Sequence, residues 1–149
     1  MDHYFLLKKE RGFSPKETID KMSEYFVELR NTFGMTIFPI QQFNQGLSSV
    51  ERQKFKGADL SPAQGDFRDS TNPYQDADVV LGIMNPAKLD MEECLGYDLE
   101  KIENVIMLKI IKNRLSSDNI AIGLQANPKA GNFIELPLAK TIDYNKFKI

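Results

Sequence analysis

The most regular hydrophobic pattern in the chain predicts one amphipathic helix near the N-terminus. Ser14, Pro15 and Glu17 place a capping hydroxyl, a proline at the first helical position and an acid three residues after the cap, which together are the signature of a helix start. Gly34 suits the position just after a helix end. We therefore predict a helix over residues 15–32. Apolar side chains recur along it at spacings of three and four residues and form one stripe: Ile19, Met22, Phe26, Leu29 and Phe33.

Two short apolar runs after this helix predict buried strands. The run 35–42 (MTIFPIQQ) contains β-branched residues typical of a strand. Pro39 counts against full pairing of this strand, because proline has no N–H to donate. The run 79–84 (VVLGIM) predicts a second buried strand, which ends before Asn85 and Pro86.

The C-terminal half of the chain predicts antiparallel pairing. Runs 105–111 and 120–126 flank a polar tip and predict a hairpin, and residues 133–136 are candidates for an edge strand. Residues 44–72 are polar and without a period, so they predict a long loop of the kind that is usually functional or disordered. Residues 88–101 predict a mobile connection. The order of elements predicts one α/β domain of 149 residues, with a mixed sheet, flanking helices and a C-terminal antiparallel hairpin.

Composition narrows the classes of protein that the chain can represent. It contains 19 Lys plus Arg and 21 Asp plus Glu, a net charge of −2, so any nucleic-acid surface must be local rather than spread over the molecule. Cys94 is the sole cysteine and His3 the sole histidine, which excludes an internal disulfide and a zinc site of four cysteine or histidine ligands. Because no apolar run approaches 18 residues and no signal peptide is evident, we expect a cytoplasmic protein with no membrane partner.

Four further segments follow one another in a fixed order around the predicted helix and hairpin. They are residues 2–4 (DHY), 41–45 (QQFNQ), 66–70 (DFRDS) leading to 75–80 (QDADVV), and 111–114 (IKNR). In this order and at this spacing they resemble the C-terminal half of the RecA-like ATPase core of DnaB-type replicative helicases of bacteria or phages. The resemblance spans nearly the whole chain.

The resemblance implies two residues that respond to nucleotide. Asp2 occupies the place of the Walker B aspartate, which in that family helps to hold Mg²⁺ on the nucleotide phosphates. Gln42 resembles the sensor glutamine, whose amide can donate to a phosphate oxygen and accept from a neighbour. The family usually has an arginine where this chain has Gln45, which puts one phosphate or subunit contact in doubt. The alternatives are a solvated N-terminal aspartate and capping amides at a strand end.

The long loop resembles the segment that lines the helicase channel and touches single-stranded DNA. Lys54, Lys56 and Arg68 are candidates to neutralise phosphates, and Asp69 and Ser70 to offer backbone N–H groups. The family has a glycine where this chain has Thr71, so the closest approach of backbone to phosphate is in doubt. A solvated basic loop is the alternative.

Lys112 and Arg114 resemble the pair that reaches into the neighbouring subunit's nucleotide site in that family. Two residues apart in a strand, they are expected to project from one face. The arginine would act in trans as a finger on the transferring phosphoryl group, because a guanidinium stays charged and binds phosphate oxygens bidentately. Solvated edge charges that discourage aggregation are the alternative.

No Gly-x-x-x-x-Gly-Lys-Ser/Thr motif occurs in the sequence, so the chain lacks the loop that cradles phosphates. The expected fold is therefore a partial RecA-like P-loop NTPase core without the Walker A strand and loop. ATP and Mg²⁺ are expected in the complete protein, and neither ATP binding nor hydrolysis in the isolated chain. The expected partners are single-stranded DNA and copies of the same subunit in a ring. In the isolated chain, either residues 35–42 pair directly with residues 79–84 or a dimer completes the sheet.

Two other functions remain open at this point. One is a non-enzymatic module that binds nucleic acid or an intact helicase, and the other is a small metal-dependent enzyme built on Asp66, Asp69, Asp76 and Asp78. Whether the chain is a fragment or a natural stand-alone protein also stays open.

Overall fold

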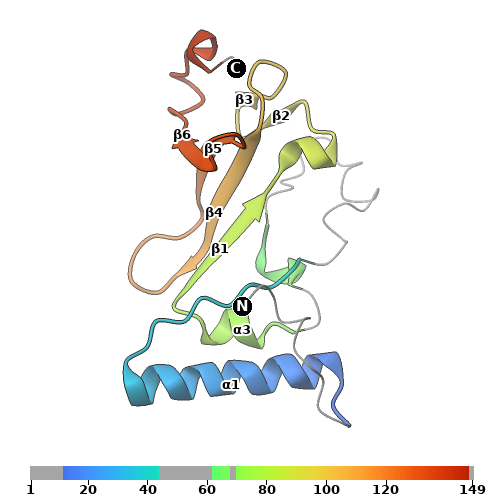
Figure 1. The fold of residues 1–149 in the computed structure, drawn as a ribbon, viewed down its shortest axis with the longest axis vertical. Helices are drawn as coiled ribbons and strands as arrows, with labels where there is room; N and C mark the ends of the chain where they lie inside the picture. Colours follow the sequence, from blue (N-terminus) through green and yellow to red (C-terminus); the bar gives the residue numbers. More distant parts are fainter. Residues whose placement is uncertain (1–11, 44–61, 68–69, 148–149) are drawn as a thin grey trace. The chain divides into compact units, whose positions relative to one another are not determined.

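The computed structural model describes residues 12–43, 62–67 and 70–147, and the chain divides after Asp78 into two compact units (Figure 1). We call the part up to Asp78 the N-terminal unit and the part from Val79 the C-terminal unit. Among the described residues, no helix is long and apolar enough to cross a membrane.

Helix α1 (Pro15–Phe33) dominates the N-terminal unit and confirms the predicted helix, which ends one residue later than expected. The Glu17 N–H donates to Ser14 Oγ at 3.2 Å and the Ser14 N–H donates to Glu17 Oε2 at 2.7 Å, so the predicted capping box is complete. Gly34 takes a left-handed conformation with φ 64° and donates its N–H to the Arg30 carbonyl. Glycine adopts this conformation without steric cost, which explains the sharp helix end.

The buried strand predicted over residues 35–42 is wrong. The structure assigns no strand to these residues, and Phe38 is 81% exposed. A strand needs a partner for its ladder, and Pro39 removes one donor. The segment makes a single antiparallel bridge just beyond its end, where Phe43 lies opposite Phe67.

The rest of the described N-terminal unit consists of short turns packed by rings and polar side chains. A 3₁₀ turn, η3 (Gln64–Asp66), precedes the bridge at Phe67, and α3 (Asn72–Asp76) follows it and packs against α1. The ring centroids of Phe43 and Phe67 lie 5.3 Å apart and those of Phe67 and Tyr74 lie 5.6 Å apart. These residues fall partly within the predicted loop 44–72, of which residues 44–61 and 68–69 lie outside the described part.

The C-terminal unit is built on a four-stranded sheet with the order β1-β4-β5-β6 (Figure 1). All three pairings are antiparallel, which confirms the predicted hairpin and edge strand. The parallel strands expected of a mixed sheet are not among the strands that the structure describes. The strands are β1 (Val79–Met84), β4 (Val105–Asn113), β5 (Ile120–Asn127) and β6 (Asn132–Glu135).

The connection over residues 88–101, predicted to be mobile, contains secondary structure in this unit. It begins in the 3₁₀ turn η4 (Pro86–Leu89) and continues as a small hairpin of β2 (Glu93–Cys94) and β3 (Tyr97–Asp98). Strands of two residues are too short for an alternating pattern to reveal them. A last 3₁₀ turn, η5 (Tyr144–Lys146), lies in the C-terminal segment.

One face of the four-stranded sheet is buried and the other is not. The buried core includes Met84, Met107 and Leu136, against which the partly buried Ile142 and Phe147 of the C-terminal segment pack. In β1 the burial alternates, with Val79, Leu81 and Ile83 exposed, so the strand predicted to be buried is buried on one face only.

Tyr97 of the β2–β3 hairpin packs against Gly123 of the four-stranded sheet. A Cβ atom at Gly123 of β5 would lie 2.8 Å from the Tyr97 ring, so only glycine fits here without a shift. The Tyr97 hydroxyl donates to the Pro137 carbonyl at 2.9 Å. Burial raises the pKa of this hydroxyl, which favours the neutral donor form.

Candidate functional site

The tip of the β4–β5 hairpin carries the candidate finger. Arg114 is the first residue after β4 and is exposed, while Lys112 lies inside β4 opposite Val80 and is half-buried. The expectation that both residues lie in a strand is therefore wrong for Arg114, because the ladder ends at Asn113. A shift in register between Val80 and Leu81 produces a bulge in β4 just before Lys112. Such bulges re-aim the side chains that follow them.

An asparagine that sequence reasoning passed over organises this tip. Asn113 Oδ1 accepts the Leu115 N–H at 3.0 Å, and Asn113 Nδ2 donates to the Ser117 carbonyl at 3.4 Å. The base of the tip is closed where the Asn119 N–H donates to the Ile110 carbonyl at 2.7 Å, with Asn119 in a left-handed conformation of φ 56°. Asparagine followed by polar residues is a common turn signal, and it was the available clue.

In the N-terminal unit, Ser70 is the predicted DNA-binding residue whose placement can be described. Ser70 is 4% exposed, and its hydroxyl donates a hydrogen bond to Asp20 of α1. The same oxygen accepts the Asn72 N–H at 3.1 Å, and Gln41 Nε2 donates to the Ser70 carbonyl at 3.2 Å. The hydroxyl and carbonyl of Ser70 thus already hold the chain in place, and its backbone N–H was the group predicted to meet phosphate.

Asp20 is the charged centre of this contact. Partial burial opposes its charged form, but hydrogen bonds from the Ser70 hydroxyl and the Lys16 ammonium outweigh that effect, so the pKa of the carboxyl is lowered. The Lys16 Nζ lies 3.0 Å from Asp20 Oδ2.

Gln41 and Gln42, the two glutamines at the predicted sensor position, differ in exposure and in hydrogen bonding. Gln42 is exposed, whereas the amide of Gln41 reaches Ser70 across 29 positions of the sequence. The described structure thus connects residue 41, rather than residue 42, to the start of α3. The other predicted site residues lie outside the described part of the chain: Asp2, Lys54, Lys56, Arg68 and Asp69.

Three of the four acidic residues of the alternative metal enzyme lie in the described part of the chain, and each of them has a hydrogen-bond or ion-pair partner. Asp66 Oδ2 accepts the Ala63 N–H at 2.8 Å, and Asp76 Oδ2 accepts the Ser23 hydroxyl at 2.7 Å. Asp78 Oδ2 lies 3.0 Å from Arg30 NH1. Within residues 12–43, 62–67 and 70–147, no group of three or more acidic, histidine or cysteine side chains is placed to hold a metal ion.

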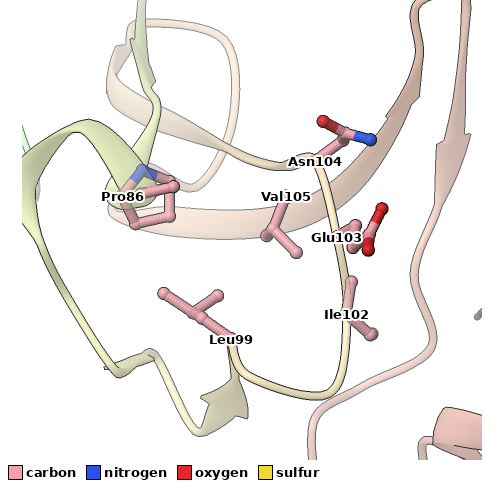
Figure 2. A pocket seen from close by; sticks show the side chains of 7 residues that line it. Pro86, Leu99, Ile102, Glu103, Asn104 and Val105 are labelled. Carbon is pink, nitrogen blue, oxygen red and sulfur yellow. The ribbon is translucent and has the colours of Figure 1, made fainter.

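An open pocket of about 300 Å³ lies beside the start of β4 (Figure 2). Pro86, Leu99 and Val105 present apolar side chains around it, as Figure 2 shows. Glu103 is the sole ionisable residue in its lining, and a carboxylate repels phosphate. The pocket therefore does not suit a nucleotide.

The sequence matches no protein-family model and no curated protein. Several solved structures match its fold, among them an ATPase domain and a DnaB-like replicative helicase described with its interactions with primase. Each of these two gives a TM-score of 0.71 at 20% identity and covers 91% of this chain. This chain spans 43% of the first structure's chain and 29% of the second's.

At this level of identity the likeness concerns the fold. With 91% of the chain covered, the likeness extends into both units. The chain has the fold of part of the ATPase domain of DnaB-like replicative helicases.

Proposed function

We propose that this chain is the C-terminal segment of the RecA-like core of a DnaB-like replicative DNA helicase, and that it acts in ATP-driven unwinding within a ring of identical subunits. The observation that carries the proposal is a lysine and an arginine, Lys112 and Arg114, at the end of a hairpin strand in a chain with this fold. The order of the other segments supports it.

Arg114 is the proposed trans-acting finger. It is exposed just past the last paired residue of β4, at a hairpin tip that extends beyond the sheet. A guanidinium there can reach a nucleotide held by another subunit and can neutralise charge on the transferring phosphoryl group. Lys112, half-buried two residues earlier in β4, would contribute a second positive charge.

ATP and Mg²⁺ would belong to the assembled protein. The described residues offer no metal-binding group of acidic side chains, and the sequence has no phosphate-binding loop motif. Of this chain's residues, we assign only Asp2 to nucleotide-bound Mg²⁺. In this proposal the rest of the chain supplies positive charge to the nucleotide site of a neighbouring subunit, and it contacts DNA.

Single-stranded DNA is the proposed polymer substrate. We assign Lys54, Lys56 and Arg68 to phosphate contacts, and Asp69 and Ser70 to backbone contacts. A link between the sensor region and this loop is supported by the hydrogen bond from Gln41 to the Ser70 carbonyl. In this proposal Gln42 senses the nucleotide, and the adjacent Gln41 transmits its position to the loop.

The experiment is steady-state ATP hydrolysis with single-stranded DNA by the complete protein that contains this chain. Arg114→Ala should lower kcat by about a thousandfold or more with little change in KM, because the finger acts on the transition state. Arg114→Lys should also fail, because an ammonium cannot bind bidentately. Lys129→Ala is the matched control, since Lys129 is the cation in the β5–β6 turn at the other end of the sheet. Wild-type turnover by Arg114→Ala would contradict the proposal.

A non-enzymatic binding module is the second candidate, favoured by the missing phosphate-loop motif. It predicts salt-sensitive binding of single-stranded DNA, or binding to an intact helicase, without any hydrolysis that depends on Arg114. Fluorescence anisotropy with labelled oligonucleotide, measured beside the hydrolysis assay, separates the two functions.

A further inference from the structure

We propose that Asn113 is a positioning residue for Arg114, fixing the hairpin tip so that the finger points in one direction before another subunit is met. This inference rests on the proposed function of Arg114 and adds a residue that has no part in binding the nucleotide itself.

Arg114 lies between two residues, Asn113 and Leu115, that are hydrogen-bonded to each other. The side-chain oxygen of Asn113 accepts the N–H of Leu115 at 3.0 Å, which closes a turn whose middle residue is Arg114. Closing this turn restricts the backbone of residue 114, and therefore the direction in which its side chain leaves the strand. The amide nitrogen of Asn113 reaches further and donates to the Ser117 carbonyl at 3.4 Å.

Apolar packing does not fix the conformation of the tip. Residues 114–119 are all exposed, and Leu115 is 86% exposed. Hydrogen bonds shape the tip: two involve the Asn113 side chain, the Asn119 N–H donates to the Ile110 carbonyl at 2.7 Å, and Asn119 Nδ2 donates to Asp118 Oδ1 at 3.2 Å. The first two depend on one side chain.

Asparagine is suited to this role because its amide accepts and donates at the same time. Alanine removes both bonds. Serine keeps a neutral acceptor that can form the same type of turn more weakly, and it adds no charge beside Arg114.

Order at the tip matters if the finger acts across a subunit boundary. A group misplaced by about 1 Å can cost about a hundredfold in rate, so an unbraced tip should slow hydrolysis while leaving nucleotide binding intact. We expect Asn113→Ala to lower kcat by about ten- to a hundredfold, less than Arg114→Ala, with KM for ATP unchanged.

The test uses two readouts on the complete protein. Amide hydrogen exchange of Leu115 reports the turn directly, and DNA-stimulated hydrolysis reports the finger. Asn113→Ala should lose protection at Leu115 and lose kcat, and Asn113→Ser should recover part of both. Amide hydrogen exchange in the paired residues of β4 and β5 should stay slow in both variants. Slow exchange there would show that the hairpin itself remains folded.

Asn127→Ala is the matched control. Asn127 ends β5 as Asn113 ends β4, and its Oδ1 accepts the Ala130 N–H at 3.2 Å in the turn at the opposite end of the sheet. It should leave kcat and Leu115 protection unchanged.

The outcomes separate this inference from the proposed function. If Arg114→Ala keeps full turnover, the finger is wrong and the inference falls with it. If Arg114→Ala is inactive but Asn113→Ala keeps its turnover, or keeps protection at Leu115, the finger stands and the positioning role is overturned. Loss of turnover in Asn127→Ala equal to that in Asn113→Ala would also overturn it, because any loosened turn would then suffice.

Discussion

At the scale of single residues, Asp20 shows how a charged side chain in α1 holds a distant segment. It accepts hydrogen bonds from Ser70, fifty positions away, and from Lys16 one helical turn before it. Its side chain is 19% exposed, so water screens these bonds less than at a fully exposed site. The contact joins helix α1 to the residue that opens the α3 segment.

This contact predicts a pH dependence of stability. The folded pKa of Asp20 is lowered below its ordinary value of 3.8, so the charged form is favoured by folding. The contribution is present at pH values above 3.8 and is lost as the pH falls through the lower folded pKa. The loss in unfolding free energy between pH 6 and pH 2 should be smaller in Asp20→Asn than in the wild type.

Urea unfolding at the two pH values, followed by circular dichroism, measures this difference. Ser70→Ala removes one of the two donors and should give an intermediate pH dependence. An equal loss in Asp20→Asn and in the wild type would show that the titration of other groups sets the acid stability.

Single-residue predictions succeed where the cause is local. Ser14, Glu17 and Gly34 could be assigned from sequence because a helix cap involves only residues within one turn. Gln41 and Gln42 could not be told apart, because their difference lies in a bond from Gln41 to Ser70 that the fold creates. Asn113 is an intermediate case. Its turn is local and could be predicted from sequence, but its effect on Arg114 depends on where β4 ends.

At the scale of elements, several polar contacts hold α1 against the segment of α3, and two of them differ in burial. Ser23 is 3% exposed and donates to Asp76 at 2.7 Å. Arg30 pairs with Asp78 at 3.0 Å, but the Asp78 side chain is 47% exposed. The two contacts have similar distances but differ in burial: the Ser23–Asp76 hydrogen bond is the more buried, and the Arg30–Asp78 ion pair is the more exposed.

We expect the buried contact to contribute more to stability. Ser23→Ala should cost about 1–3 kcal/mol, because a partly buried carboxylate loses a donor. Asp78→Asn should cost about 0–1 kcal/mol, because exposed ion pairs contribute little. Denaturant midpoints of the two variants measure the order, and a larger cost for Asp78→Asn would contradict this account of the α1–α3 contact.

Element predictions held where partners are close in sequence. The β4–β5 hairpin was predictable because its two apolar runs are joined by a short polar tip. Residues 35–42 have an equally apolar pattern, but a strand also needs a partner, and local pattern carries no information about one. The β2–β3 hairpin was missed because each strand has two residues.

At the scale of the whole molecule, β1 lies at the edge of its sheet and exposes apolar side chains. Within the C-terminal unit it pairs with β4 alone among the strands that the structure describes, and direct pairing with residues 35–42 of the N-terminal unit stays a prediction. Val79, Leu81 and Ile83 are 44%, 51% and 65% exposed. An unpaired apolar edge promotes association with another chain.

The dimer accordingly stays a prediction for the isolated chain. Light scattering should show a dimer that Ile83→Lys converts to monomer, because a charge on the exposed face costs free energy when that face is covered. Leu138→Lys is the control, since Leu138 is 76% exposed in the segment after β6. A monodisperse wild-type monomer at high concentration would contradict the prediction.

The fold of the whole chain was recognisable from short segments although its neighbours share 20% identity. The resemblance was drawn from the order and spacing of those segments, which follow the sequence of helix, strands and turns, rather than from any single residue. Which residues act is a finer question, since the roles proposed for Gln42, Lys112 and Arg114 require a second subunit and a nucleotide.

The most direct measurement of the central claim is ATP hydrolysis by mixed assemblies of the complete protein. Subunits with Arg114→Ala are combined with subunits whose phosphate-binding loop is inactivated, and hydrolysis is measured with single-stranded DNA. If Arg114 acts in trans, some boundaries join an intact nucleotide site to an intact finger, and the mixture regains activity that neither variant has alone. A mixture no more active than its components, under conditions in which mixed assemblies containing wild-type subunits are active, would contradict the claim.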